Sequence, residues 1–313
     1  MLENVLLTAR ETGVLFALMM LGVLARQLRI MDAHAVRKAT DFLILIIAPC
    51  LILTSFQRSF ESSMLVGLGW SFAAGFFFHF TGILLGRIFV RDPDERRRRC
   101  LRWATIFANC GFMGLPLEEA LFGAEGVFYG VASIAVFNML AWTYGVALIR
   151  GGFRDGESVF ALKAILNPAI SSLFVALPLF FLPWRLPYVI AQPIAAIGSM
   201  NTPLSMVVTG YYLAGANFRL ALSSGSSYVM LALRHIAVPA VLIAVFAFCP
   251  FIPLNVRLIN VIPAAAPIGA LLTVFAVRYD GDAEFSTAMV AVSTLLSILT
   301  LPLMIAVAQQ VFQ

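Results

Sequence analysis

Charge is scarce in this sequence. Only 12% of its 313 residues are Asp, Glu, Lys or Arg, whereas about a quarter of an ordinary soluble domain is charged. Hydrophobic residues make up 61% of the chain, and its mean hydropathy is +0.94. This balance excludes a soluble globular protein and indicates an integral membrane protein.

The alternation of apolar and polar residues that marks membrane strands is also missing. The apolar residues form long continuous runs instead, which predict membrane helices. At roughly 20 residues per span, the chain has room for about ten spans and no large soluble domain. We therefore expect an all-α integral membrane protein.

Cysteine and histidine are few, with four and three residues. The cysteines form no C-x-x-C pair and have no histidine at metal-ligand spacing, so we expect free thiols and no metal site. The sequence also lacks a Ser-His-Asp set, a phosphate-binding loop and a dinucleotide-binding glycine pattern. We expect neither an enzyme nor a cofactor.

Two apolar runs carry helix-breaking residues at their centres. One break is Asn109-Cys-Gly111-Phe-Met-Gly114-Leu-Pro116, and the other is Val261-Ile-Pro263-Ala-Ala-Ala-Pro267-Ile-Gly269. Proline and glycine weaken a helix, and in lipid a break survives only when it is buried in protein or lines a wet cavity. Two such breaks, one in each half, predict inverted repeats with a substrate site between them.

The expected organisation is two repeats of five spans, residues 1–150 and 160–313, joined by a charged, glycine-containing loop. We read the first apolar run as a retained span rather than a cleaved leader. Pro49 and Pro203 are separated by nearly the same length of chain as Pro116 and Pro263, which favours a duplication. The ten expected spans cover about 5–25, 41–56, 64–88, 103–122, 126–149, 162–181, 190–214, 234–248, 258–277 and 285–307.

Basic residues predict the orientation. Assigned alternately to the loops, seventeen of the 21 lysines and arginines fall on one side of the membrane and four (Arg10, Arg58, Arg185 and Arg257) on the other. Because cytoplasmic loops carry the excess of Lys and Arg, both termini are expected on the outer side of the membrane. We expect the protein to reside in the inner (cytoplasmic) membrane. The net charge of +5 is thereby explained without a nucleic-acid partner.

Several motifs then occur in order along nearly the whole chain. The most specific is Ala108-Asn109-Cys-Gly111-Phe112-Met-Gly114-Leu-Pro116, which continues to Leu121-Phe122-Gly123-Ala-Glu125-Gly126. Others are Leu21-Gly22-Val-Leu-Ala25-Arg26, Ala48-Pro49, Phe137-Asn138 with Trp142 and Gly145, Asn167-Pro168, Thr202-Pro203-Leu204-Ser205 with Gly210, Pro263, Ala276-Val-Arg278-Tyr279 and Thr300-Leu301-Pro302-Leu303. In these motifs the sequence resembles the auxin efflux carrier family, whose bacterial members include malonate and malate permeases.

The resemblance implies ten transmembrane helices as two inverted five-helix repeats, similar to the sodium–proton antiporter and bile-acid transporter folds. Spans four and nine would cross at their prolines, and a scaffold part would form a homodimer while a transport part moves. Family members carry small organic acids. This chain departs from the family in having Ile262-Pro263 and a second proline, Pro267.

A carboxylate in a low-dielectric cavity needs donors already aimed at it, and a helix that restarts after a break offers unpaired N–H groups at a positive dipole end. Amide and hydroxyl side chains can add donors, although the same groups can instead bridge helices. Small and proline residues can shape the break. The candidate substrate-binding residues are Asn109, Gly111, Gly114, Pro116, Asn138, Asn201, Thr202, Pro263 and Pro267.

Charged and titratable side chains near the spans have competing readings. Asp41 is the candidate for coupling to H+ or Na+, or else it lies in the first turn of its helix, where an acid is favourable. We expect Glu118 and Glu119 to face the outer mouth, and His79 and His235 to lie at the membrane interface or to pack between helices. The run Arg96–Arg99 is expected to fix orientation and to contact anionic lipid heads.

The function that these features favour is secondary transport of a small organic anion across the lipid bilayer. Two alternatives remain open. A membrane-embedded enzyme would need clustered ionisable residues within the spans, which this sequence nearly lacks. A receptor or scaffold of the same fold would bind a ligand or partner without moving it.

Overall fold

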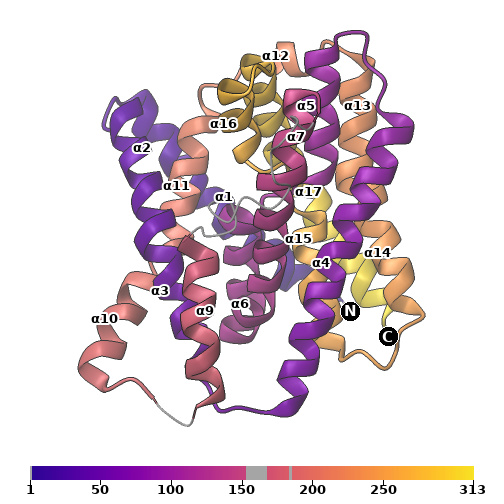
Figure 1. Ribbon diagram of the computed structural model, residues 1–313. Coiled ribbons are helices and arrows are strands. Elements are labelled where there is room, and N and C mark those ends of the chain that lie inside the picture. The colour runs from indigo at the N-terminus through magenta and orange to yellow at the C-terminus, as the bar shows by residue number, and fades with distance from the viewer. Residues whose placement is uncertain (1, 153–167, 183–184) are drawn as a thin grey trace.

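A computed structural model describes residues 2–152, 168–182 and 185–313 (Figure 1). These residues form an all-helical structure, in which the only extended pairing is one isolated bridge. In chain order the helices are α1 (Leu2–Gln27), α2 (Ala33–Phe42), η1 (Leu43–Ile47), α3 (Ala48–Phe56), α4 (Ser62–Phe89), α5 (Glu95–Ile106), η2 (Cys110–Gly114), α6 (Leu115–Leu140), η3 (Ala141–Gly145), α7 (Val146–Arg150), α9 (Pro168–Phe181), α10 (Tyr188–Gly198), α11 (Asn201–Leu213), α12 (Phe218–Ala221), α13 (Gly225–Ala232), η4 (Leu233–Ala237), α14 (Val238–Ala247), α15 (Leu254–Ala265), α16 (Leu271–Arg278) and α17 (Ala283–Val311), where η marks a π-helical turn.

Five helical stretches in the described residues are long and apolar enough to cross a membrane. They are Ala33–Phe56, Ser62–Phe89, Cys110–Arg150, Gly225–Ala247 and Ala283–Val311. Shorter apolar helices, among them Leu254–Ala265, lie between them. The prediction of an all-α, multi-pass membrane protein is therefore confirmed.

Gly123 divides the longest of these stretches. Its φ of 58° and ψ of −143° lie outside the helical region, so the chain turns back on itself there. Residues Cys110–Phe122 thus form a short arm, and the residues after Gly123 continue as a separate long helix to Arg150. This bend coincides with the loop expected between spans four and five.

Two predicted span boundaries are wrong. The second span begins at Ala33, where the Asp32 side chain accepts a hydrogen bond from the Ala35 N–H (2.7 Å), so Asp41 lies two turns inside the helix and not in its first turn. The eighth begins at Gly225, which puts Arg234 within the helix instead of at its start. Both errors come from placing the charged residue at the edge of the apolar run. Arg154, Lys163 and Asn167 lie outside the described residues.

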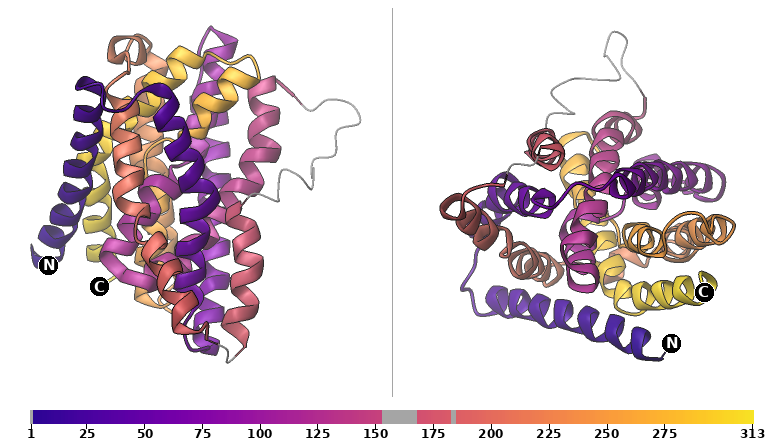
Figure 2. Two further views of the ribbon diagram at one scale, coloured as in Figure 1. Left: turned by 90° about the vertical axis from the view of Figure 1, so that its left-hand side faces the viewer. Right: turned by 90° about the horizontal axis from the view of Figure 1, so that it is seen from below.

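The two interrupted helices lie at the centre of the molecule. In Figure 1, α6 and α15 run through the middle, with α3 and α9 on one side and α4 and α14 on the other. The two ends of the chain, α1 and α17, pack together along one side (Figure 2).

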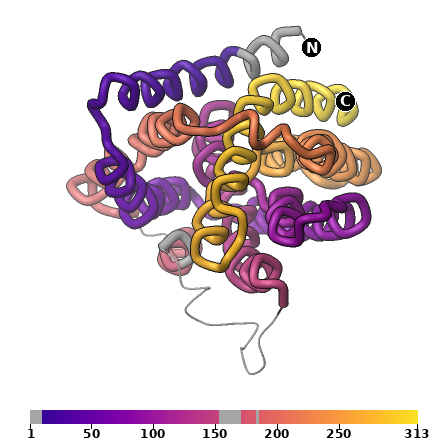
Figure 3. Tube along the Cα trace, turned by 90° about the horizontal axis from the view of Figure 1, so that it is seen from above, coloured from indigo at the N-terminus to yellow at the C-terminus, as the bar shows by residue number. Residues whose placement is uncertain are grey.

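Helices α1 and α11 are in backbone contact, side by side in Figure 3. A Cβ atom built on Gly22 would lie 2.0 Å from the Val207 carbonyl oxygen, and one built on Gly210 would lie 1.9 Å from the Met19 carbonyl oxygen. Only glycine fits at both positions, and the small-residue contact is typical of membrane helix pairs.

Candidate functional site at the crossing of two broken helices

The two breaks predicted from the sequence meet. After α5 the chain leaves the helix through Phe107–Asn109, and after α15 it leaves the helix at Ala266 and Pro267. The Asn109 N–H donates to the Pro267 carbonyl (2.7 Å), and the Gly269 N–H donates to the Phe107 carbonyl (2.9 Å). These bonds form an antiparallel bridge between Ala108 and Ile268, so each break supplies backbone partners that the other lacks.

Local chemistry explains where each helix stops. Pro267 disfavours the helical conformation at the preceding residue, and Ala266 is accordingly extended, with φ −62° and ψ 152°. On the other side Asn109 caps the restart, because its side-chain oxygen accepts a hydrogen bond from the Phe112 N–H (3.1 Å). Pro116 falls in the first turn of α6, where a missing N–H is tolerated, so the crossing lies before it.

A cavity of about 470 Å³ opens beside the crossing. It is lined by residues at the starts of η2 and α16, the two restarts at which a helix resumes after its break. Threonines from several helices and the aromatic side chains of Phe112, Phe137 and Trp142 complete the wall. A mostly apolar cavity with a few polar groups is the usual form of a small-molecule site.

At the two points where the helices resume, three backbone N–H groups of lining residues have no acceptor within the described part of the chain. They belong to Gly111 on the first restart and to Ala270 and Leu271 on the second. Each restart is the N-terminal end of a helix, where unpaired donors and the positive end of the dipole coincide. Both ends therefore offer donors to one cavity.

Three predicted amide residues line the same cavity. The Asn109 oxygen serves as the cap, while its Nδ2 makes no hydrogen bond among the described residues. Asn201 is 2% exposed, and its buried Nδ2 likewise has no partner there. Asn138 donates through Nδ2 to the Ile134 carbonyl of its own helix (2.9 Å).

The other predicted residues lie outside the lining. Gly114 backs onto Pro263 at the crossing, and the Thr202 hydroxyl donates to a Glu119 carboxylate oxygen (2.9 Å). Pro267 contributes its carbonyl to the bridge. Asp41 has a half-exposed side chain 4.0 Å from the Lys38 ammonium group. Gly114, Pro263 and Pro267 thus shape the crossing rather than the cavity wall.

Arg234 is a central residue that the sequence reading placed in a cytoplasmic loop. It is fully buried in η4, within an otherwise apolar helix. Its Nη1 donates to the Thr105 and Ile106 carbonyls (both 3.3 Å) at the end of α5, and its Nη2 donates to the Ala264 carbonyl near the end of α15. One guanidinium group therefore caps the carboxyl ends of α5 and α15, the half-helices that precede the two breaks.

The signal for Arg234 was present in the sequence, because a charged residue inside a membrane helix is a functional candidate by default. The predicted span 234–248 instead placed Arg234 at the end of its helix, where a charged residue is common. The neighbouring His235 lies between Thr300 (3.0 Å) and Ser293 (2.8 Å), and the Ser293 oxygen also accepts from the Ile268 N–H (3.0 Å). These contacts connect the second break to α17, so of the two expected positions for His235, interface or helix packing, the structure has the second.

Glu118 does not face the outer mouth. It is fully buried, and both carboxyl oxygens lack hydrogen-bond partners among the described residues. Its carboxyl group packs against Gly130, because the bend at Gly123 folds the following helix back over the short arm. The prediction failed because the sequence did not reveal how sharply the chain turns there.

Comparison with known proteins identifies relatives among membrane transporters. The family described as "Membrane transport protein" matches residues 13–159 and 152–305. A protein of Methanothermobacter thermautotrophicus, named only as an uncharacterized transporter, is 27% identical over 298 residues, covering 91% of this chain and 93% of its own length. The chain therefore belongs to the membrane transport protein family, which is the auxin efflux carrier family that its motifs resemble.

Proposed function

We propose that this protein is a secondary carrier of small organic anions, mono- or dicarboxylates such as malonate or malate. The observation that carries the proposal is the pair of half-helix N-termini whose unpaired N–H groups, at Gly111, Ala270 and Leu271, belong to the wall of one cavity. A carboxylate placed there would accept hydrogen bonds from fixed donors without displacing any existing partner. The free amide donors of Asn109 and Asn201 extend the same set.

Charge at the crossing favours an anion. A helix N-terminus carries a partial charge of about +0.5 and a C-terminus about −0.5. At a crossing all four ends lie close together, so the negative ends of α5 and α15 would offset the positive ends of η2 and α16. Arg234 binds the two negative ends, and its charge balances them. The two positive ends are then left to act on the cavity.

We further propose the ten-span, inverted-repeat plan, with residues 1–150 and 160–313 as the repeats. The antiparallel bridge between the breaks supports it, because elements related by an inverted repeat run in opposite directions. A helix halved by a break, such as α15 with its 12 residues, is too short to cross a membrane alone, so two such halves would together form one span. Substrate would move by elevator-like alternating access, with the arginine-rich loops in the cytoplasm.

Counterflow in proteoliposomes tests the function. Protein reconstituted with internal malate should accumulate labelled mono- or dicarboxylates, and Asn109→Ala should lower this flux at least tenfold. Asn255→Ala removes the same amide from an exposed site at the start of α15 and serves as the matched control.

Two outcomes would count against the proposal. Equal fluxes for wild type and Asn109→Ala across the anion panel would exclude the proposed site. Anion-dependent thermal stabilisation of the wild type, without any flux, would instead favour the receptor or scaffold alternative.

A further inference from the structure

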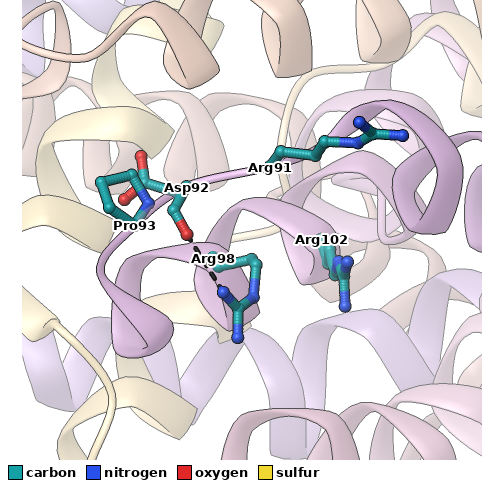
Figure 4. A pocket seen from close by; sticks show the side chains of 5 residues that line it. All are labelled: Arg91, Asp92, Pro93, Arg98 and Arg102. Atoms are coloured by element: carbon teal, nitrogen blue, oxygen red, sulfur yellow. Dashed lines mark hydrogen bonds between the residues drawn. The ribbon is translucent and has the colours of Figure 1, made fainter.

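A second pocket lies at the arginine-rich end of the molecule, between the end of α4 and the first turns of α5. It has a volume of about 420 Å³ and is lined by Arg91, Asp92, Pro93, Arg98 and Arg102 (Figure 4). Arg98 and Arg102 are one helical turn apart on α5, so their side chains share one face. Arg91 belongs to the loop that precedes this helix.

Two kinds of arginine are found along α5. Arg96 pairs with Asp280 (2.8 Å), Arg97 pairs with Asp282 (3.0 Å), and Arg99 pairs with Glu95. The three pocket arginines form no ion pair within the described residues. Arg98 donates only to the backbone carbonyl of Asp92 (3.1 Å), and the Nε of Arg102 is buried without a partner.

The one acid in the pocket is engaged elsewhere. The Asp92 carboxylate accepts hydrogen bonds from the Asp94 N–H (3.0 Å) and the Ser224 hydroxyl (2.8 Å). The Ser226 hydroxyl donates to the Arg91 carbonyl (2.6 Å), so the loop is fastened to the start of α13. The pocket wall is thus fixed in place, and its three cations against one carboxylate leave a net charge of +2.

The surface next to the pocket is apolar and belongs to a membrane helix. On the last turns of α4, Leu84, Ile88 and Phe89 are exposed by 59%, 46% and 53%. A ligand with a phosphate at the level of the arginines and acyl chains along α4 would match both surfaces. Arginine recognises phosphate through paired N–H groups, and basic pockets at the cytoplasmic ends of membrane helices suit anionic lipid heads.

We propose that this pocket binds the phosphodiester group of an anionic phospholipid. The site is separate from the cavity at the crossing, and the proposal does not depend on which substrate is carried. Since α5 runs from Arg102 directly to the break at Phe107, a lipid held here steadies the first half of a crossing helix.

Native mass spectrometry of the delipidated protein in detergent tests the site, with phosphatidylglycerol as the probe and phosphatidylcholine as the neutral lipid. The double variant Arg98→Gln/Arg102→Gln should lose at least tenfold in phosphatidylglycerol affinity. Arg96→Gln/Arg97→Gln removes the same charge from the same helix at paired arginines and should retain wild-type affinity. Gel filtration reports whether each variant is folded, and Arg91→Gln replaces the double variant if that one aggregates.

Three results would overturn the proposal. One is equal phosphatidylglycerol binding by wild type and the pocket variant, and another is an equal loss in both double variants. The third is competition by inorganic phosphate or glycerol 3-phosphate at millimolar concentration, which would assign the pocket to a soluble phosphate.

Discussion

The backbone N–H of Asn109 donates a hydrogen bond to the carbonyl oxygen of Pro267 across 2.7 Å, joining two segments from opposite halves of the chain. Backbone groups buried in lipid need partners, and at this point each half supplies them to the other. Neither break could persist alone in a membrane. The site and the pairing of the halves therefore depend on the same few bonds.

Replacing Arg234 tests the charge balance at the crossing. Arg234→Gln should leave several carbonyl groups short of a donor, at a cost of about 1–3 kcal/mol for each buried group, and should lower carboxylate transport at least tenfold. Arg234→Lys keeps the charge with fewer donors and should recover part of the anion affinity. Thermal unfolding in detergent and counterflow measure the two effects. A Gln variant as stable and as active as the wild type would exclude this role.

The two glycines that line the cavity should respond differently to substitution. A Cβ on Gly111 meets no atom within 4 Å, whereas one on Gly269 lies 3.2 Å from the Ala108 carbonyl oxygen and 3.3 Å from the Phe137 ring. Gly111→Ala should therefore keep the unfolding temperature, and Gly111→Leu should remain folded but lose transport because its side chain fills the cavity. Gly269→Ala should lower the unfolding temperature by straining the bridge. The reverse order of stabilities would contradict the geometry.

Gly22 should be far less tolerant than Gly13, although both lie in α1. A Cβ at Gly22 would overlap the Val207 carbonyl, whereas Gly13 has no atom within 4 Å. We expect Gly22→Ala to destabilise the protein by about 1–3 kcal/mol through overpacking. Gly13→Ala should stabilise it by up to about 1 kcal/mol, since alanine is the better helix former. Thermal unfolding of the two variants side by side decides the matter.

Asp41→Asn should leave the pH dependence of transport unchanged. Its carboxylate is half-exposed beside Lys38 and is not among the residues that line the cavity, whereas a coupling group is expected to be buried with access to the cavity. Uptake measured from pH 5 to 8 in both proteins checks this expectation. A shifted profile in the variant would return Asp41 to the coupling role.

The sequence predicts best the positions of residues that act on their own stretch of backbone. Proline, glycine and a capping Asn mark helix ends wherever they occur, so the breaks around Asn109 and Pro267 could be read from the sequence. Arg234 and Glu118 could not be placed, because their burial depends on where a span begins and how sharply the chain bends after it. A prediction from hydropathy places charged residues at the ends of spans. In the structure, both side chains are instead buried by the helices packed around them.

The glycine contact between α1 and α11 limits how this molecule can change shape. Where the two backbones approach this closely, no side chains lie between them that could repack, so we expect this pair of helices to move as one body. The Arg26 guanidinium also donates to the Tyr211 carbonyl (3.1 Å) and stacks over the Tyr211 ring, which adds a latch at the end of the same seam. In the elevator-like mechanism proposed above, the boundary between the stationary and the moving part would therefore run elsewhere, and α11, which contributes Asn201 to the cavity wall, would carry α1 with it.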